Sequence, residues 1–87
     1  MLLEFNLQIT RENKTVKITP ITTRIDATNS IDFEYALLKY AEFYDIVFDF
    51  KNIDYISSNA IGAIIQIYKT LNKFDNTLTV INYSSSV

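Results

Sequence analysis

Residues 46–64 read IVFDFKNIDYISSNAIGAI, a sequence in which an apolar run passes into a helical pattern. The run from Asp45 to Phe50 is typical of a central strand that is buried on both faces. The polar residues 57–59 are of the kinds that commonly cap a helix. After them, apolar residues recur at the spacing of an amphipathic helix that ends near Asn72, namely Ile61, Ile64, Ile65, Tyr68 and Leu71. The sequence here therefore predicts a buried strand followed by a helix.

The residues before this stretch predict a β-hairpin. Apolar and polar residues alternate from 3 to 8, as they do in a half-buried strand, and residues 11–14 form a polar turn. A second strand is expected from about 15 to 22, because β-branched residues dominate it. Within that strand, Pro20 indicates an edge position or a bulge, since proline cannot donate to the ladder.

Two further elements complete the predicted order β-β-α-β-α-β. Capping residues followed by apolar residues at helical spacing predict a helix from about Ser30 to Phe43. A last strand is expected over residues 76–82, where apolar and polar residues alternate. Strands joined through helices pair in parallel by right-handed crossovers, so the expected class is α/β. We expect one domain over residues 1–87.

The same patterns predict the core. We expect seven residues to be largely buried: Val47, Phe48, Ile61, Ile64, Ile65, Tyr68 and Val80. The aromatic residues at core-facing spacing need no ligand to explain them, and we assign them to the core as well: Phe33, Phe43, Tyr44, Phe48, Phe50 and Tyr68.

Composition argues against most enzyme and metal chemistry. The chain has neither cysteine nor histidine, which removes thiolate catalysis, the usual neutral-pH proton shuttle and the commonest zinc ligands. Asp49 and Asp54 could suggest a carboxylate pair, but no histidine or glycine-rich phosphate loop accompanies them. We therefore expect no catalytic residue, no metal site and no cofactor.

Charge and hydropathy limit the classes of molecule that the chain is expected to bind. A net charge of −2 and a pI of about 4.9 disfavour nucleic-acid binding, which needs a concentrated positive field. The longest apolar patch, residues 60–67, is too short to span a membrane, and the N-terminus does not read as a signal peptide. We expect a cytoplasmic protein without membrane insertion.

The stretch 46–64 resembles the signature of STAS domains, in which a strand leads into Asp-Ser-Ser-Gly-Leu-Gly and then a helix. It aligns without a gap, with Ser57 at the acidic position and Ala60 at the first glycine position. A weaker likeness lies at residues 23–26, TRID, which resembles the turn before the first helix of that family. The resemblance implies a STAS-like fold, and Gly62 matches the final glycine of the signature.

The resemblance also implies a function. In anti-sigma factor antagonists of this family, a partner anti-sigma kinase phosphorylates the first serine of the signature, and the dephosphorylated form binds that kinase. The matching residue here is Ser58. The implied partner is an anti-sigma factor or a switch-type serine kinase. An alternative is a STAS subunit or domain of a transport assembly, such as a lipid-asymmetry ABC system or an anion transporter.

Each candidate residue has a structural reading beside the functional one. Ser58 is the candidate phosphorylation site, or it merely caps the helix. The implied partner-binding surface comprises Asp26, Ser57, Ser58, Asn59 and Ile61. Ser57 could also be a second phosphate acceptor, and its structural alternative is a capping or turn residue. The structural alternatives are a turn or cap for Asp26 and a solvated first-turn residue for Asn59.

The last expectation concerns the end of the chain. Members of the resembled family carry a further helix after the fourth strand, and residues 84–87 come directly after the last predicted strand. We expect part of the sheet, beside Val80, to be uncovered, and the chain to form a homo-oligomer or to use a neighbouring molecule to cover that face.

Overall fold

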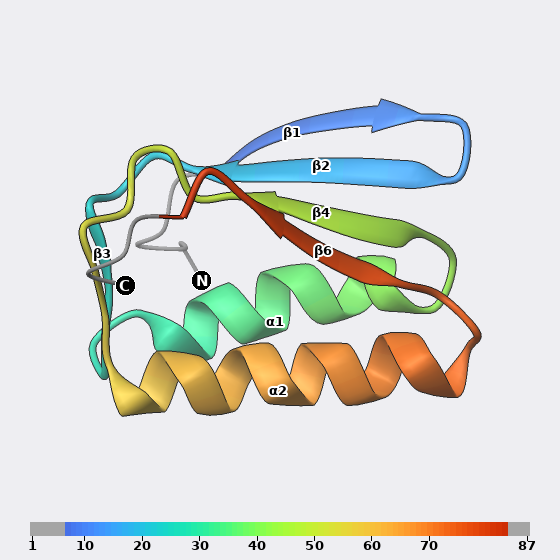
Figure 1. Cartoon of the computed structure of the whole chain (residues 1–87). Coiled ribbons are helices and arrows are strands. Elements are labelled where there is room, and N and C mark those ends of the chain that lie inside the picture. The colour runs from blue at the N-terminus through green and yellow to red at the C-terminus, as the bar shows by residue number, and fades with distance from the viewer. Residues whose placement is uncertain (1–6, 84–87) are drawn as a thin grey trace.

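Both helices lie on one face of a four-stranded sheet in the computed structural model, which describes residues 7–83 (Figure 1). The strand order is β1-β2-β4-β6, and a second, two-stranded sheet pairs β3 with β5. β1 (Leu7–Glu12) is antiparallel to β2 (Thr15–Pro20), whereas β4 (Asp45–Asp49) is parallel to both β2 and β6 (Leu78–Ile81). The predicted α/β class is confirmed.

The hairpin differs in detail from the prediction. β1 continues to Glu12, so the turn is shorter than residues 11–14, and Asn13 adopts a positive φ of 55° within it. The beginning of the expected first strand, residues 3–6, lies outside the described residues. The edge position suggested by Pro20 is wrong, because β2 lies between β1 and β4. Pro20 is tolerated because it ends the strand, and the ladder with β4 has already stopped at Ile18.

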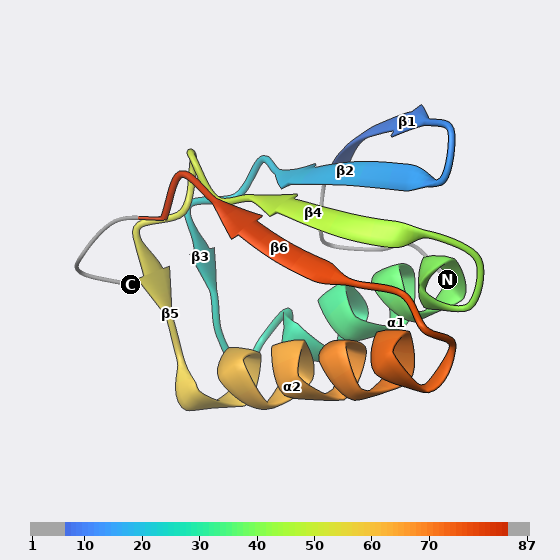
Figure 2. The same cartoon turned by 45° about the vertical axis from the view of Figure 1, so that its right-hand side comes forward.

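The two helices follow their predicted bounds closely. α1 spans Ser30–Ala41 and α2 spans Ser58–Lys73. They run side by side beneath the sheet (Figures 1 and 2), and their buried faces close the core against its inner side. None of the helices in the described part of the chain is long and apolar enough to cross a bilayer. The largest fully buried apolar side chains of this core are Phe33, Phe48, Ile18, Ile25, Leu37, Ile46, Ile67 and Leu71.

The buried face of α2 is not the predicted one. Ile61, Ile65 and Tyr68 are 51%, 45% and 53% exposed, and Ile64 is half-buried. The buried residues of α2 are Ala60, Ala63, Ile67 and Leu71. The physical reason is size: alanines let a helix approach its neighbours closely, whereas a stripe of isoleucine and tyrosine would hold it away.

The aromatic residues divide in the same way. Phe33, Phe48 and Phe50 are buried as expected, with ring centroids 5.5 Å apart for Phe33 and Phe48. Tyr44 packs partly against the core. Phe43 is exposed, because α1 ends at Ala41 and the following residues turn toward β4, and Tyr68 lies on the outer side of α2.

Helices cover only one face of the sheet, so the expectation that residues 45–50 are buried on both faces holds in part: on the face without helices Asp49 is 2% exposed, but Val47 is only half-buried. Ile18, Phe48 and Val80 are adjacent in register and belong to the inner face, where Phe48 is buried and Val80 is half-buried against the core. Lys17 and Val47 stand in register on the opposite face, and Val47 is half-buried there. The face beside Val80 is therefore the one that the helices cover.

Candidate functional site

A short parallel pairing brings the candidate residues to one end of the molecule. β3 (Arg24–Ile25) pairs with β5 (Tyr55–Ile56), and the Ser57 N–H donates to the Ile25 carbonyl at 2.9 Å. The loop before α1 and the loop before α2 thus lie side by side (Figure 2). Neither strand is among the predicted elements, because two residues are too few to show a period of two.

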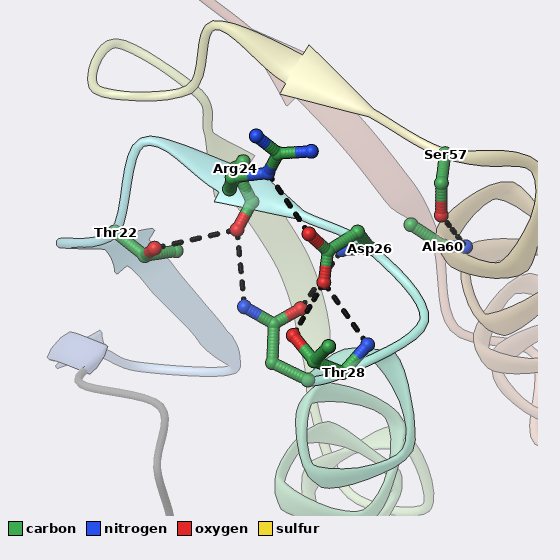
Figure 3. Close-up of polar contacts among 7 residues, drawn as sticks. Thr22, Arg24, Asp26, Thr28, Ser57 and Ala60 are labelled. Atoms are coloured by element: carbon green, nitrogen blue, oxygen red, sulfur yellow. Dashed lines mark hydrogen bonds and ion pairs between the residues drawn. The ribbon is translucent and has the colours of Figure 1, made fainter.

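Ser57 is the N-cap of α2. Its backbone is extended, with φ −83° and ψ 170°, and its hydroxyl accepts a hydrogen bond from the Ala60 N–H at 3.3 Å (Figure 3). This bond satisfies one of the amide groups that the first turn of a helix leaves without an intrahelical partner. The cap role considered for Ser58 therefore belongs to Ser57.

Ser58 is the first residue of α2, and its side chain is exposed. Within residues 7–83 its hydroxyl makes no hydrogen bond to another group. It stands at the helix end where unpaired N–H groups give a partial positive charge. Asn59 and Ile61 are exposed beside it. The structure thus places an accessible hydroxyl next to an exposed apolar side chain.

Asp26 is bonded within its own loop. One carboxylate oxygen, Oδ1, accepts from the N–H and the hydroxyl of Thr28, at 3.0 and 2.6 Å, and the other, Oδ2, accepts from Arg24 Nε at 2.9 Å (Figure 3). The hydrogen bonds from Thr28, followed by the Arg24 guanidinium, hold the pKa of Asp26 below its usual value despite partial burial. Both oxygens already serve the turn before α1, which is the structural reading given to Asp26 above.

Arg24 lies at the site although it was not among the candidate residues predicted from the sequence. Its guanidinium pairs with Asp26 and lies 4.8 Å from the ring centroid of Tyr55, a cation–π contact that joins the two loops. The neighbouring Asn29 ties the same turn, because its amide donates to the Arg24 carbonyl and its oxygen accepts from the Asp26 N–H. Residues two apart in an extended segment share a face, and this rule could have paired Arg24 with Asp26.

Two positions of the signature, Ala60 and Gly62, lie inside α2. Ala60 is fully buried and helical, so no glycine is needed there. Gly62 has no positive φ, and a methyl group added at its Cα would meet nothing within 4 Å. A glycine at such a position destabilises a helix by about 1 kcal/mol relative to alanine.

Asp49, the carboxylate at the end of β4, has a structural role. Its side chain is 2% exposed, accepts hydrogen bonds from the Asn82 amide and the Lys51 N–H, and lies 3.4 Å from Lys17 Nζ. Burial tends to raise the pKa of Asp49, but these donors outweigh it and the pKa is lowered. Asp54 is exposed. In the ranges that the structure describes, no three acidic residues cluster as metal ligands would.

The mixed sheet, the two helices on one of its faces and the paired loops at the start of α2 define an α/β domain of the SpoIIAA-like class. The STAS domain family matches residues 8–87. The chain belongs to the STAS domain family. No curated protein sequence matches the chain significantly.

Solved structures show the same fold at low sequence identity. The anti-sigma factor antagonist SpoIIAA in its unphosphorylated form is 15% identical, with a TM-score of 0.77 over 94% of this chain and 76% of that one. A putative anti-sigma factor antagonist from Thermotoga maritima is 17% identical, with a TM-score of 0.79 over 95% and 71%. The murine anion transporter Slc26a9 is 14% identical, with a TM-score of 0.73 over 85% of this chain and 13% of that one.

Proposed function

We propose that this chain is a regulatory binding protein of the anti-sigma factor antagonist type, and not an enzyme. In this proposal it binds an anti-sigma factor or a related switch serine kinase through the start of α2, and phosphorylation of Ser58 releases the partner. The observation that carries the proposal is the exposed hydroxyl of Ser58 at the first position of α2, which makes no hydrogen bond within the described residues 7–83. Membership of the STAS family and the likeness in fold to SpoIIAA support it.

The position of Ser58 suits a phosphate. A phosphoserine carries roughly −1.5 to −2 charges at neutral pH, and the N–H groups and dipole at a helix N-terminus stabilise such an anion. The same charge would stand beside the exposed side chain of Ile61. A partner that buries Ile61 would then have to desolvate the phosphate, so the modification disfavours the complex.

Ser57 is the weaker acceptor in this proposal, although it stands at the acidic position of the signature. Its hydroxyl is held by the Ala60 N–H, and its side chain is half-buried. Phosphorylating Ser57 would require a kinase to break the cap, whereas the Ser58 hydroxyl is accessible without any change.

The direct test uses the full chain with the purified switch kinase of the same organism, ATP and Mg²⁺. Mass spectrometry should locate a single phosphate on Ser58. Ser58→Ala should abolish incorporation, and the matched control Ser57→Ala should retain it. A phosphate on Ser57, or a kinase that neither binds nor modifies the chain, would contradict the proposal.

A second proposal is that the domain serves a transport assembly. It is favoured by Ser57 and Ala60, which depart from the antagonist signature, and by the likeness in fold to Slc26a9. Purification of the chain from its native cells separates the two proposals. A permease subunit as the stoichiometric companion would favour transport, and a serine kinase would favour the antagonist.

A further inference from the structure

No contact within the described part of the chain explains why position 62, inside α2, is a glycine. It is the fifth residue of a 16-residue helix, it is exposed, and its φ is not positive. Apart from its chain neighbours and the backbone of its own helix, an added Cβ would have no heavy atom within 4 Å, so no other element excludes a side chain. Because glycine destabilises a helix relative to alanine, its presence points to a contact made with another molecule.

The surroundings of Gly62 form a continuous strip along the outer side of α2. Residues three or four apart share a helix face, so Ser58, Gly62, Ile65 and Lys69 follow one another along that side, and all are exposed. Ser58 and Gly62 are one turn apart, which makes the candidate phosphorylation site the direct neighbour of the glycine.

The charge of α2 is opposite in sign to that of the whole chain. The chain has a net charge of −2, but α2 carries Lys69 and Lys73 and no acidic residue. Neither lysine takes part in an ion pair within residues 7–83. A partner that matches this surface would present carboxylates near the C-terminal half of α2 and apolar side chains near Ile65.

We propose that an amphipathic helix of the partner, apolar in its middle and acidic at the end that meets Lys69, crosses α2 at Gly62. This inference rests on the proposed function, because the helix is assigned to the anti-sigma factor or switch kinase. The missing side chain at Gly62 lets the two backbones approach more closely than the usual helix–helix distance of about 8–10 Å. Ile65 packs against the crossing helix, and Lys69 pairs with its carboxylate.

A second copy of this chain fits the surface poorly. An identical α2 would bring Lys69 and Lys73 against other lysines or apolar residues, and it would supply no carboxylate from the helix itself.

The crossing explains how one phosphate could control the complex. A phosphate on Ser58 would stand one helical turn from the point of closest approach, on the same side of α2. It would also place about two negative charges on a surface whose partner is acidic. Steric and electrostatic effects then act in the same direction.

The test is calorimetric titration of the full chain with the purified anti-sigma factor or switch kinase. Gly62→Ala should weaken binding about tenfold and Gly62→Leu more, since each fills the crossing point. Both variants should melt at or above the temperature of the unmodified chain, because alanine and leucine favour the helix. Lys69→Glu should also weaken binding about tenfold, whereas the matched control Lys14→Glu, in the distant β1–β2 turn, should stay within about twofold.

The outcomes separate this inference from the proposed function. If the unmodified chain binds and the two Gly62 variants bind equally well, the crossing at Gly62 is wrong while the proposed function stands. If Lys69→Glu binds as well as Lys14→Glu, the acidic partner helix is wrong. If the unmodified chain does not bind the kinase, the proposed function fails and the inference fails with it.

Discussion

At the residue scale, two adjacent serines are expected to behave differently. Ser57 caps α2 through its bond to the Ala60 N–H, whereas the Ser58 hydroxyl is unbonded in the described part of the chain. Ser57→Ala should therefore lower the free energy of unfolding by about 1 kcal/mol. Ser58→Ala should change it by less than about 0.5 kcal/mol. Urea titration followed by circular dichroism measures both, and equal losses would contradict the assignment of the cap.

The ionisation of Asp49 makes the free energy of unfolding depend on pH in the acid range. Burial opposes ionisation, but Asn82, the Lys51 N–H and Lys17 lower the folded-state pKa of Asp49 below the ordinary value of 3.8. The unfolded chain then binds a proton more readily than the folded chain. The contribution of Asp49 is therefore fully present above its unfolded pKa and is lost as the pH falls through the folded pKa.

Asp49→Asn removes that ionisation and keeps the shape of the side chain. We expect the unfolding free energy of the variant to fall less steeply than that of the unmodified chain as the pH drops from about 5 to 3. Asp54→Asn, at an exposed carboxylate, is the matched control. Parallel pH profiles for the unmodified chain and Asp49→Asn would show that the pKa of Asp49 is not lowered by folding.

The candidate site was partly predictable from the sequence. The signature located Ser58 and Asn59, and both are exposed, whereas Ile61 was expected both in the core and on the partner-binding surface and is exposed. The sequence could not tell which serine is the cap, because both are of the capping kind and only the backbone conformation at Ser57 decides it. The Arg24 bond to Asp26 joins residues two apart and was predictable once the segment is known to be extended, but the pairing of β3 with β5 that makes it extended was not.

At the element scale, the orientation of α2 can be tested by two isoleucines. Ile67 is fully buried and Ile65 is nearly half exposed. Ile67→Ala should lower the unfolding free energy by about 2–5 kcal/mol through the lost contacts and the cavity. Ile65→Ala should lower it by no more than about 1 kcal/mol, since water already reaches its side chain. Chemical denaturation measures both losses, and similar values would mean that the buried face of α2 is assigned wrongly.

The sequence predicted the helices and strands better than it predicted which of their sides are buried. Periodicity predicted both helices and the four long strands, because each spans enough residues to repeat. Periodicity predicted that isoleucine and tyrosine form the buried side of α2 and did not predict the buried alanines, although a tightly packed helix buries small residues. Sequence periodicity finds an amphipathic helix, but the shape of its neighbours decides which apolar side is buried.

For the molecule as a whole, the structure removes the reason to expect self-association. That expectation assumed an uncovered apolar face beside Val80, but Val80 packs toward the core under the helices. On the opposite face, Lys17 pairs with Asp49. We now predict a monomer for the isolated chain in sedimentation at micromolar concentration. A dimer that dissociates on Lys17→Ala would contradict this prediction and would place the interface on the face opposite the helices, not on the face beside Val80.

In the proposed function, the state of the Ser58 hydroxyl decides whether a partner is bound. The most direct measurement compares the affinity of the purified switch kinase or anti-sigma factor for the unmodified chain and for the chain phosphorylated stoichiometrically at Ser58. We predict at least an approximately tenfold weaker complex after phosphorylation, because the charge stands beside Ile61 and Gly62 at the exposed start of α2. Equal affinities for the two forms would contradict the claim.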